Sequence, residues 1–451
     1  MDKRIFKAYD IRGVYPSELD GEIFRKLGVA FGNIFGKKIV VGGDYRTSTP
    51  ALKKSFIEGL IAAGCKVIDV GSVPTPVLIF SIKYLGCDGG ISVTASHNPK
   101  EYNGMKFFNS IPVPIVRDGG YDKLVKLVES GEIKEIGGGS VEAIDVVPDY
   151  LDFVLKNSDL KSLKGKKIVT DCGNGAAGPV YPKAFKMLGA EVVELYSEPD
   201  GTFPNHPADP SHSDNLKDLV AKVREAKADF GFGFDGDGDR LGVVDRNGKI
   251  LETILVFSVL INRCMKEHTG SGVVYDALTS QRVQDVIKIK GGIPLVCRVG
   301  HPFIMGKMVA EKSWLAGELS GHFYHLQQTY SDDDALFATL KFLKELESGK
   351  TLEQYEKEIP KYFSAVSEEQ RILVNADLKW KFVEDLEKRF RREGRDVNTL
   401  DGVKVIFPHG WAIFRPSNTE PKIAYAYESS DAKEFSEIKN FVEGILKEAP
   451  R

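Results

Sequence analysis

The feature that most constrains the fold of this chain is a repeated pattern of strand, turn, helix, glycine and second strand. Three segments of about 40 residues each follow this pattern, and in each the first strand ends in an aspartate. The first strands are expected at residues 38–45, 166–171 and 272–276, and the second strands at 65–70, 191–195 and 293–297. Apolar runs bounded by glycine and alternating with helical periods favour mixed or parallel sheets covered by helices. The pattern predicts three related α/β domains, although unrelated βαβ units resemble one another in the same way.

The length of the chain predicts several domains. A chain of 451 residues is too long for one hydrophobic core and suits three or four domains of about 100–150 residues. From about residue 366 no copy of the repeat is evident, and strands with amphipathic helices predict a separate α+β domain. We therefore expect four domains, at residues 1–148, 149–250, 251–365 and 366–451.

Composition excludes several classes of protein. The net charge of −3 gives no electrostatic case for binding nucleic acid or an acidic membrane. Five cysteines without a CxxC pair suit reduced thiols. The most apolar run, Ile254 to Ile261, is far shorter than the roughly 20 residues that cross a bilayer, and reads as a buried strand or helix segment. The amino terminus lacks the apolar run of a signal peptide. We expect a soluble, cytoplasmic protein.

The first of four loops with chemical groups reads TASHNP, residues 94–99, and follows an apolar strand at residues 90–93. The hydroxyl of Ser96 at a strand end, before a Pro99 that could open a helix, is well placed to carry a phosphate, because free backbone N–H groups there stabilise negative charge. A plain turn or a helix N-cap accounts for the same residues. Taken alone, this loop favours the plain turn.

The second loop, residues 234–240, reads FDGDGDR between two apolar strands. Asp235, Asp237 and Asp239 repel one another unless a cation lies among them, and hard oxygen ligands with room for further partners indicate Mg²⁺. A calcium loop of the EF-hand type is excluded, because its required glycine and glutamate are replaced by Arg240 and Arg246. A solvated acidic turn is the weaker alternative, because carboxylates between buried strands are costly without a partner.

The remaining two loops read GELSGH at residues 317–322 and RPSNTEP at residues 415–421. The first offers a carboxylate and a hydroxyl that could accept from and donate to sugar hydroxyls, and the second offers one guanidinium with short hydrogen-bonding side chains, which suits a phosphate. Either could be an ordinary turn. One loop falls in each expected domain, and together they describe phosphoryl transfer on a polyol.

These four loops resemble the signatures of the α-D-phosphohexomutase family, in the expected order and over essentially the whole chain. Supporting segments are FKAYDIRG (6–13), DCGNGAAG (171–178), PDGTFPNH (199–206) and VGHPFI (299–304). The chain is most similar to the phosphomannomutase/phosphoglucomutase branch. The resemblance implies three related α/β mixed-sheet domains and a C-terminal α+β domain around a central cleft, which carry in turn the phosphoserine, the metal, the sugar-binding groups and the phosphate-binding groups.

The resemblance also implies a role for each site residue. Ser96 would carry the phosphoryl group and coordinate Mg²⁺ with the three aspartates. Catalysis would involve Ser96, Lys106, Arg240 and His322. The substrate would be bound by Tyr9, Arg12, His301, Glu318, Ser320, Arg415, Ser417, Asn418 and Thr419. Lys106 and His322 are the candidates for the general base, and Lys106 would need a pKa well below about 10.4 to act near neutral pH.

The implied reaction moves a phosphoryl group between O1 and O6 of glucose or mannose phosphates through a 1,6-bisphosphate, with glucose 1,6-bisphosphate as activator. Phospho-Ser96 would donate the group to the free hydroxyl, and the intermediate would turn over and return its other phosphate. The expected partners are small hexose phosphates, with neither nucleic acid nor membrane, and the chain would be a monomer or a dimer.

Two departures keep other substrates open. Many bacterial members carry a lysine where this chain has Leu278, and NGMKFF (103–108) leans toward phosphoglucosamine mutases. Against that branch stand YDIRG (9–13) and GELSGH. A phosphatase that transfers the Ser96 phosphoryl group to water is an alternative of another class, but it would not need the phosphate loop at Arg415. A non-catalytic sugar-phosphate sensor is disfavoured by Ser96 and the three aspartates.

Overall fold

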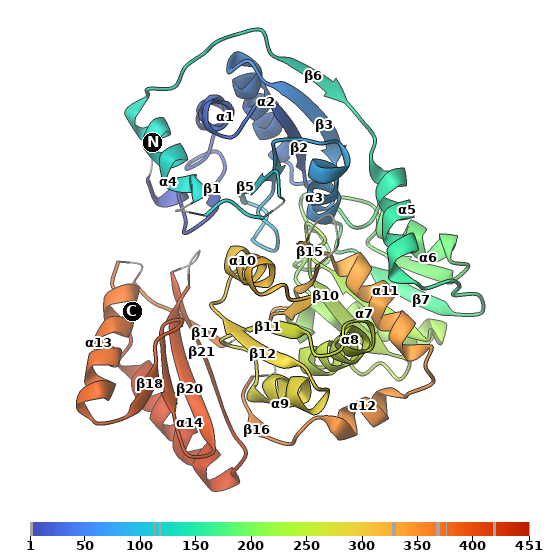
Figure 1. Cartoon of the computed structure of the whole chain (residues 1–451), viewed down its shortest axis with the longest axis vertical. Coiled ribbons are helices and arrows are strands. Elements are labelled where there is room, and N and C mark those ends of the chain that lie inside the picture. The colour runs from blue at the N-terminus through green and yellow to red at the C-terminus, as the bar shows by residue number, and fades with distance from the viewer. Residues whose placement is uncertain are drawn as a thin grey trace. The chain divides into compact units, whose positions relative to one another are not determined.

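The computed structural model describes residues 3–111, 113–116, 119–326, 331–366, 370–375, 377–417 and 421–450. The chain divides into two compact units (elements labelled in Figure 1). The first unit comprises Met1–Leu251 and His322–Lys344, and the second comprises Glu252–Gly321 and Glu345–Arg451. The segment His322–Lys344 therefore belongs to the first unit although its flanking segments belong to the second.

The first unit begins with a mixed six-stranded sheet. In spatial order its strands are β1 (Ile11–Val14), β5 (Tyr102–Asn109), β4 (Gly89–Val93), β2 (Lys38–Gly43), β3 (Lys66–Ser72) and β6 (Ser140–Ala143). Strands β4, β2, β3 and β6 pair in parallel, whereas β5 pairs antiparallel with both β4 and β1. The helices of this part are α1 (Gly21–Ile34), α2 (Thr49–Ala62), α3 (Thr75–Tyr84) and α4 (Tyr121–Ser130), after a 3₁₀ turn at Lys3–Ile5.

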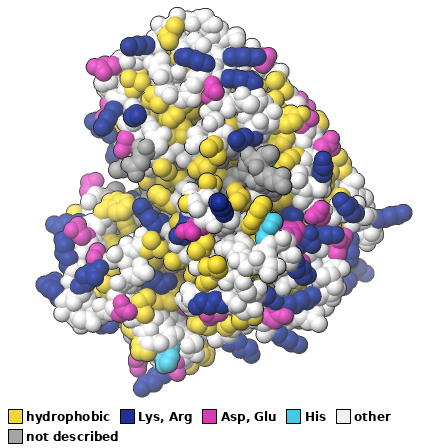
Figure 2. Space-filling model, viewed as in Figure 1, with side chains coloured by type: hydrophobic (Ala, Val, Ile, Leu, Met, Phe, Trp, Pro, Cys, Tyr) yellow, Lys and Arg dark blue, Asp and Glu magenta, His cyan; other side chains and the backbone are white. Residues whose placement is uncertain are grey.

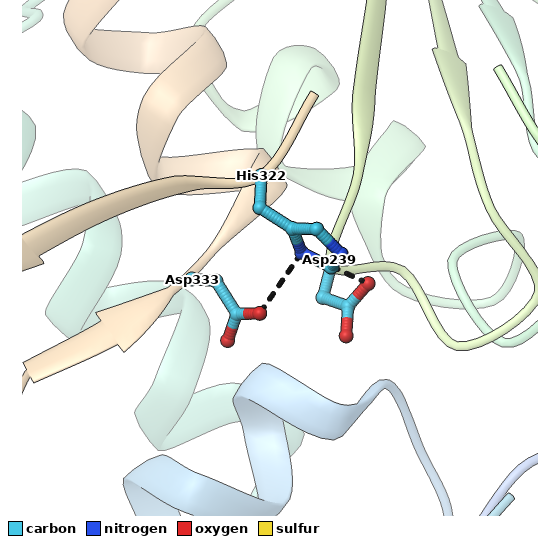
Figure 3. A group of neighbouring side chains, drawn as sticks. All are labelled: Asp239, His322 and Asp333. Carbon is cyan, nitrogen blue, oxygen red and sulfur yellow. Dashed lines mark ion pairs between the residues drawn. The ribbon is translucent and has the colours of Figure 1, made fainter. Parts of the chain in front are cut away.

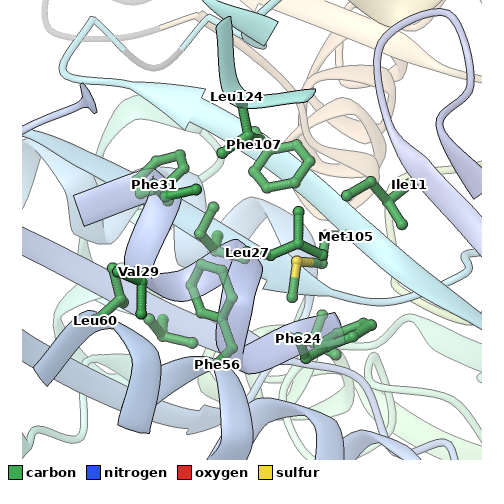
Figure 4. Close-up of a cluster of buried hydrophobic side chains, with 14 of the residues drawn as sticks. Ile11, Phe24, Leu27, Val29, Phe31, Phe56, Leu60, Met105, Phe107 and Leu124 are labelled. Atoms are coloured by element: carbon green, nitrogen blue, oxygen red, sulfur yellow. The ribbon is translucent and has the colours of Figure 1, made fainter. Parts of the chain in front are cut away.

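The core of this first sheet follows from the alternation of side chains along its strands. Ile39 and Val41 of β2 face the core that helices α1, α2 and α4 complete, whereas α3 packs against the other face. Phe31 and Phe107 stack with ring centroids 5.9 Å apart in this core (Figure 4). Each fully buried side chain of this size contributes roughly 1.5–3 kcal/mol, so the core gives the serine loop, which follows β4, a rigid support.

A second sheet in the same unit carries the acidic loop. Its strands are, in spatial order, β10 (Leu241–Asp245), β9 (Phe230–Phe234), β7 (Lys167–Asp171) and β8 (Glu191–Leu195). Strands β8, β7 and β9 are parallel, and β9 and β10 form an antiparallel hairpin. The accompanying helices are α5 (Val147–Ser158), α6 (Tyr181–Met187) and α7 (Lys217–Ala226), with a 3₁₀ turn at Ser213–Leu216. The returning segment adds β14 (Phe323–Leu326), its antiparallel partner β15 (Ser331–Asp333) and the start of α11 (Ala335–Leu346).

The second unit contains the third copy of the repeat. Its strands β12 (Ile293–Cys297), β11 (Gly272–Asp276) and β13 (Leu315–Gly317) are parallel. The helices around them are α8 (Thr253–Glu267), α9 (Gln281–Ile289), α10 (His301–Glu311) and α12 (Leu352–Glu358). Strand β13 ends where the loop containing Glu318 begins.

The end of the chain forms an antiparallel sheet in this second unit. Its strands are β16 (Phe363–Ser364), β17 (Gln370–Leu373), β18 (Asp396–Asn398), β19 (Val403–Ile406), β20 (Gly410–Pro416) and β21 (Lys422–Ser429). The order is β16-β21-β20-β19-β18, with β17 also paired to β21. Helices α13 (Lys379–Arg392) and α14 (Ala432–Lys447) pack against it. Strand β20 delivers Arg415 to the start of the phosphate loop.

The repeat predicted from the sequence is confirmed, because β2–α2–β3, β7–α6–β8 and β11–α9–β12 each form a parallel βαβ unit. The apolar run at residues 254–261 lies in a buried helix, α8. One local expectation is wrong: Pro99 opens no helix, because the serine loop is a turn that leads into strand β5. The chain there must reverse to pair antiparallel with β4.

The surface agrees with the small net charge, because Lys and Arg side chains lie among Asp and Glu side chains on the face drawn in Figure 2. All five cysteines are buried and free. Among the helices that the structure describes, none has both the length and the apolar character to cross a membrane.

Candidate active site

Ser96 lies in the turn between β4 and β5, in a strained backbone conformation. Its φ angle is 50°, a value that few residues other than glycine adopt. Its Oγ donates to Asp235 Oδ2 at 2.9 Å and lies 3.2 Å from His97 Nδ1. The serine hydroxyl, which is nearly buried, therefore faces a carboxylate of the acidic loop.

The buried guanidinium of Arg46 holds the serine loop in this conformation. It donates to backbone carbonyls within and after the turn, those of Ser96 (2.7 Å), Asn98 (2.6 Å), Pro99 (2.7 Å) and Tyr102 (3.1 Å). Asp44, at the end of β2, pairs with Arg46 at 3.1 Å and also accepts from Thr94 Oγ1 at 2.8 Å. Because backbone carbonyls of a buried turn need donors, this arginine stabilises the strained turn.

Of the two predicted substrate ligands from the amino-terminal segment, Arg12 contacts this loop. Arg12 donates to the carbonyl of Ala95 at 2.8 Å and to Asn98 Oδ1 at 2.5 Å, and it pairs with Asp10 at 3.0 Å. Tyr9 is half-buried just before β1. In this structure Arg12 supports the serine loop, and a contact of either residue with substrate stays a prediction.

The acidic loop fits closely against the serine turn because of its glycines. A Cβ atom on Gly236 would lie 2.6 Å from the backbone oxygen of Ser96, closer than any side chain tolerates. Gly238 has a φ of 77°, which glycine adopts without strain. Asp235 Oδ1 accepts from the backbone N–H groups of Asp239 (2.9 Å) and Arg240 (3.1 Å), which closes the loop on itself.

The three carboxylates of this loop form a group that could hold a metal ion. One oxygen from each of Asp235, Asp237 and Asp239 lies within 4.8 Å of the others, and all three residues are buried. Asp237 Oδ1 and Asp239 Oδ1 accept no hydrogen bond from any residue that the structure describes. Burial and the two neighbouring carboxylates raise the pKa of Asp235 well above its usual value. Oxygen ligands with unsatisfied lone pairs and a surplus of negative charge fit a hard divalent cation.

Lys106, on β5, reaches this group of carboxylates. Its Nζ lies 2.7 Å from Asp237 Oδ2 and 2.5 Å from Asp239 Oδ2. Burial alone would lower the pKa of Lys106, but Asp237, Asp239 and Asp333 together raise it above its usual value. The neighbouring carboxylates thus stabilise the charged amine, and a role of Lys106 as general base stays a prediction.

His322 forms a second cluster at the edge of the acidic loop (Figure 3). Its Nδ1 lies 3.0 Å from Asp333 Oδ2 and 3.5 Å from Asp239 Oδ1, while Arg240 Nε donates to Nε2 at 3.0 Å. Burial would lower the pKa of His322, but Asp239 and Asp333 raise it to about 9. The bond from Arg240 requires an unprotonated Nε2, so in this arrangement the ring proton lies on Nδ1, and protonation of Nε2 would have to displace Arg240.

Asp209 holds the other side of Arg240. Its Oδ1 lies 3.2 Å from Arg240 Nη1. Burial would raise the pKa of Asp209, yet the guanidinium lowers it below the usual range. Arg240 is thus fixed between a carboxylate and an imidazole.

A cavity of about 460 Å³ lies beside the serine loop, lined among others by Ser96, His97 and His206.

Residues 317–321 of the loop that was predicted to contact the sugar, called below the sugar-reading loop, lie in the second unit. Glu318 is buried and accepts from the backbone N–H of Gly300 at 3.1 Å. His301 is the first residue of α10, with Nε2 2.6 Å from the Met305 sulfur. Ser320 is partly exposed in the turn after Glu318.

Asp276, at the end of β11, supports the sugar-reading loop and accepts from Leu319 N at 2.9 Å. Burial and the nearby Glu318 raise the pKa of Asp276 to about 7. Leu278, at the position where the family resemblance led us to expect a lysine, is buried in an apolar cluster with Leu319 and Trp411.

The phosphate loop begins at the end of β20. Arg415 is nearly buried, pairs with Asp401 at 2.9 Å through Nε, and has at Nη2 no hydrogen-bond partner among the residues described. The backbone oxygen of Ser417 accepts from Lys379 Nζ at 2.7 Å. The predicted ligands Asn418 and Thr419 lie outside the described residues.

The structure brings several predicted residues together within the first unit: Ser96, Lys106, the three aspartates, Arg240 and His322. Within the second unit, Glu318 lies beside the segment of His301. Asp44, Arg46, Asp209, Asp333 and Asp401 were missed by sequence reasoning. Their signal in the sequence was weak, a place at a strand end or in an acidic run such as SDDD (331–334), because many of their contacts are made by residues that lie elsewhere in the chain.

Family models match four successive parts of the chain. They are described as phosphoglucomutase/phosphomannomutase alpha/beta/alpha domain I at residues 3–132, domain II at 148–248, domain III at 254–363, and the C-terminal domain at 364–445.

Relatives match over nearly the full length. A phosphomannomutase/phosphoglucomutase of Pseudomonas aeruginosa is 36% identical over 98% of this chain and 95% of its own. A phosphomannomutase of Escherichia coli is 35% identical over 94% of both chains. A crystal structure of a phosphoglucomutase/phosphomannomutase family protein from Burkholderia thailandensis matches with a TM-score of 0.88 and 34% identity, covering 99% of this chain and 98% of that one.

Proposed function

We propose a reaction for this site from the fact that the chain belongs to the phosphoglucomutase/phosphomannomutase family. The reaction is reversible transfer of a phosphoryl group between O1 and O6 of glucose and mannose phosphates. The observation that carries the proposal is the serine hydroxyl of Ser96 placed 2.9 Å from Asp235 in a group of three buried carboxylates. A nucleophile of this kind can hold a phosphoryl group between two transfers.

Each half of the reaction uses the same groups of the first unit. Phospho-Ser96 gives its phosphoryl group to the free hydroxyl of the sugar phosphate, which forms a 1,6-bisphosphate, and the second phosphate returns to Ser96. Arg240, held by Asp209 and His322, offers positive charge to the transferring group. Lys106 and His322 are the candidates for the group that takes the proton of the attacking hydroxyl.

The three aspartates, together with the Ser96 phosphate, would hold Mg²⁺. The cation would neutralise negative charge on the transferring phosphoryl group. The role of the protein's own residues is to place the oxygen ligands, and Gly236 allows their loop to approach the serine turn.

The sugar phosphate is recognised by groups of the second unit. Glu318, Ser320 and His301 read the hydroxyls, whereas Arg415, Ser417, Asn418 and Thr419 bind the phosphate that is not transferred. Arg415 suits this task because a buried donor without a partner favours a bound anion. Tyr9 and Arg12 would add contacts from the first unit.

Several further expectations belong to the same proposal. Glucose 1,6-bisphosphate serves as intermediate and activator, the protein acts in the cytoplasm as a monomer or dimer, and the four domains end near residues 148, 250 and 366.

A glucosamine phosphate is the second candidate substrate. It would account for Leu278, which places an apolar side chain where the family resemblance led us to expect a lysine. The two candidates differ in a single measurement, the ratio of kcat/KM for glucosamine 1-phosphate to kcat/KM for glucose 1-phosphate.

The test compares wild type with Ser96→Ala in a coupled assay of glucose 1-phosphate, mannose 1-phosphate and glucosamine 1-phosphate, with Mg²⁺, trace bisphosphate and a free-phosphate readout. We expect turnover of glucose and mannose phosphates that falls by at least about 10³-fold in the variant, without phosphate release. Thr47→Ala, which alters a hydroxyl outside the site, is the control. Full activity of Ser96→Ala, or stoichiometric free phosphate, would refute the mechanism.

A further inference from the structure

We propose that Asp401 is a positioning residue that couples the phosphate-binding Arg415 to the segment carrying the sugar-binding His301 and Glu318. The proposal rests on the proposed function, because it assigns a role toward the same hexose phosphate. All the contacts that carry it lie within the second unit.

One oxygen of Asp401 makes two hydrogen bonds. Asp401 Oδ2 accepts from Arg415 Nε at 2.9 Å and from the backbone N–H of Val299 at 2.9 Å. The side chains of Arg415 and Asp401 are only 4% and 9% exposed. The turn before β19 thus fixes both the guanidinium of the phosphate loop and the segment between β12 and α10.

The next residue of that segment is held by the sugar-binding loop. The backbone N–H of Gly300 donates to Glu318 Oε1 at 3.1 Å, and His301 follows as the first residue of α10. Two successive backbone N–H groups are therefore bound by two carboxylates, Asp401 from the C-terminal sheet and Glu318 from the loop after β13. A displacement of Asp401 would change the position of His301 and of the Glu318 carboxylate.

The geometry leaves the other end of Arg415 available. Nε is bound to Asp401, while the buried Nη2 has no hydrogen-bond partner among the described residues. A guanidinium fixed through Nε presents its Nη atoms in one plane, which suits two oxygens of a phosphate. Asp401 therefore sets the direction from which Arg415 approaches the substrate.

Because both donors bind the same oxygen of Asp401, variants at position 401 can distinguish a positioning role from a role as an ionic partner. An asparagine at position 401 can present its one carbonyl oxygen to both donors without negative charge. If the position of this oxygen determines substrate affinity, Asp401→Asn should have nearly the KM of the wild type, whereas Asp401→Ala should have a higher KM. If the ion pair matters only for stability, both variants should lower the melting temperature and neither should change KM selectively.

The experiment measures kcat, KM for glucose 1-phosphate and melting temperature of full-length wild type, Asp401→Ala, Asp401→Asn and Asp396→Ala. Asp396 is an exposed aspartate on the adjacent β18 and serves as the matched control. For Asp401→Ala we expect KM to rise at least about tenfold, as for loss of a hydrogen bond to a charged group, with kcat within about threefold. Asp401→Asn should restore KM to within about threefold. Should Asp401→Ala fail to fold, Asp401→Glu, which displaces the oxygen, should show the same rise in KM.

Arg415→Ala and the double variant with Asp401→Ala separate the proposed function from the proposed role of Asp401. Arg415→Ala alone tests the phosphate-binding role, and an unchanged KM there would refute that part of the proposed function. When Arg415→Ala raises KM, adding Asp401→Ala should raise it by clearly less than Asp401→Ala does in the wild type, because the effect through Arg415 is already lost and only the effect through the segment of His301 remains. Wild-type KM in Asp401→Ala, full additivity with Arg415→Ala, or an Asn variant as impaired as the Ala variant would overturn the coupling.

Discussion

The acidic centre around Ser96 and the cationic centre around Arg415 are built in opposite ways. In the first, Asp235, Asp237 and Asp239 are buried together, and Lys106 supplies compensating charge at 2.5–2.7 Å. In the second, one buried guanidinium meets one carboxylate and keeps a donor without a partner among the described residues. The first centre thus gathers oxygen ligands that could hold a metal ion, whereas the second presents a buried guanidinium that would suit an anion.

The supports of the two loops differ as well. The serine turn is held by Arg46, which donates to four backbone carbonyls, whereas the phosphate loop is anchored where it begins, by Lys379 at the carbonyl of Ser417. A strained nucleophile needs such a dense set of donors, because its conformation is costly without them. Substitutions in the first centre should therefore change turnover, and substitutions in the second should change affinity.

The largest expected effect is that of Asp237→Asn. The change keeps the shape of the side chain but removes a charge from the group that could hold the metal, so we expect kcat to fall by about 10²–10³, and the Mg²⁺ concentration for half-maximal rate to rise. Steady-state kinetics with a Mg²⁺ titration measures both. Asp214→Asn, at an exposed aspartate, should match wild type. A rise in KM with unchanged kcat would erase the contrast between the centres.

An intermediate effect is expected for Arg415→Lys. A lysine retains the charge but loses the planar pair of donors and the bond to Asp401, so KM for glucose 1-phosphate should rise about 10- to 100-fold while kcat stays within a few-fold. Substrate titration with wild type and Lys422→Arg, a nearby basic residue, provides the comparison. If kcat fell as much as it does in Asp237→Asn, the second centre would also take part in the transfer itself.

The smallest effect concerns the support of the sugar-reading loop and its dependence on pH. The folded pKa of Asp276 is about 7, against 3.8 for the ordinary group. The folded state therefore retains a proton that the unfolded state has lost, and stability falls as pH rises from about 4 to 7. Glu318→Gln removes the neighbouring charge, lowers the pKa of Asp276, and should reduce this loss of unfolding free energy by about 1 kcal/mol.

Denaturation by urea at pH 5 and pH 8 measures this loss of unfolding free energy in the wild type and in Glu318→Gln. Glu311→Gln, at an exposed position of α10, is the control. If the free energy of unfolding fell equally between pH 5 and pH 8 in both variants, burial alone, and not Glu318, would raise the pKa of Asp276.

Local patterns predicted much of the fold and the main chemical groups. The βαβ repeat was visible because strands end in Asp and helices end at glycine, and the DGDGDR loop was visible because its carboxylates are neighbours in sequence. The sequence could not reveal that Arg46 clamps the turn 50 residues later, or that Asp333 faces His322. Such pairs depend on tertiary packing. The carboxylates around Lys106 were hidden for the same reason, because they lie in the loop of another sheet.

The chain passes between its two compact units three times, after Leu251, Gly321 and Lys344. No single cut in the gene can therefore separate them. A fragment that ended at residue 251 would retain Ser96 and the three aspartates but lack β15 and the carboxylate of Asp333, together with His322. Anyone who wishes to exchange, fuse or express these parts independently would have to rejoin His322–Lys344 to the first fragment by circular permutation or by a designed linker.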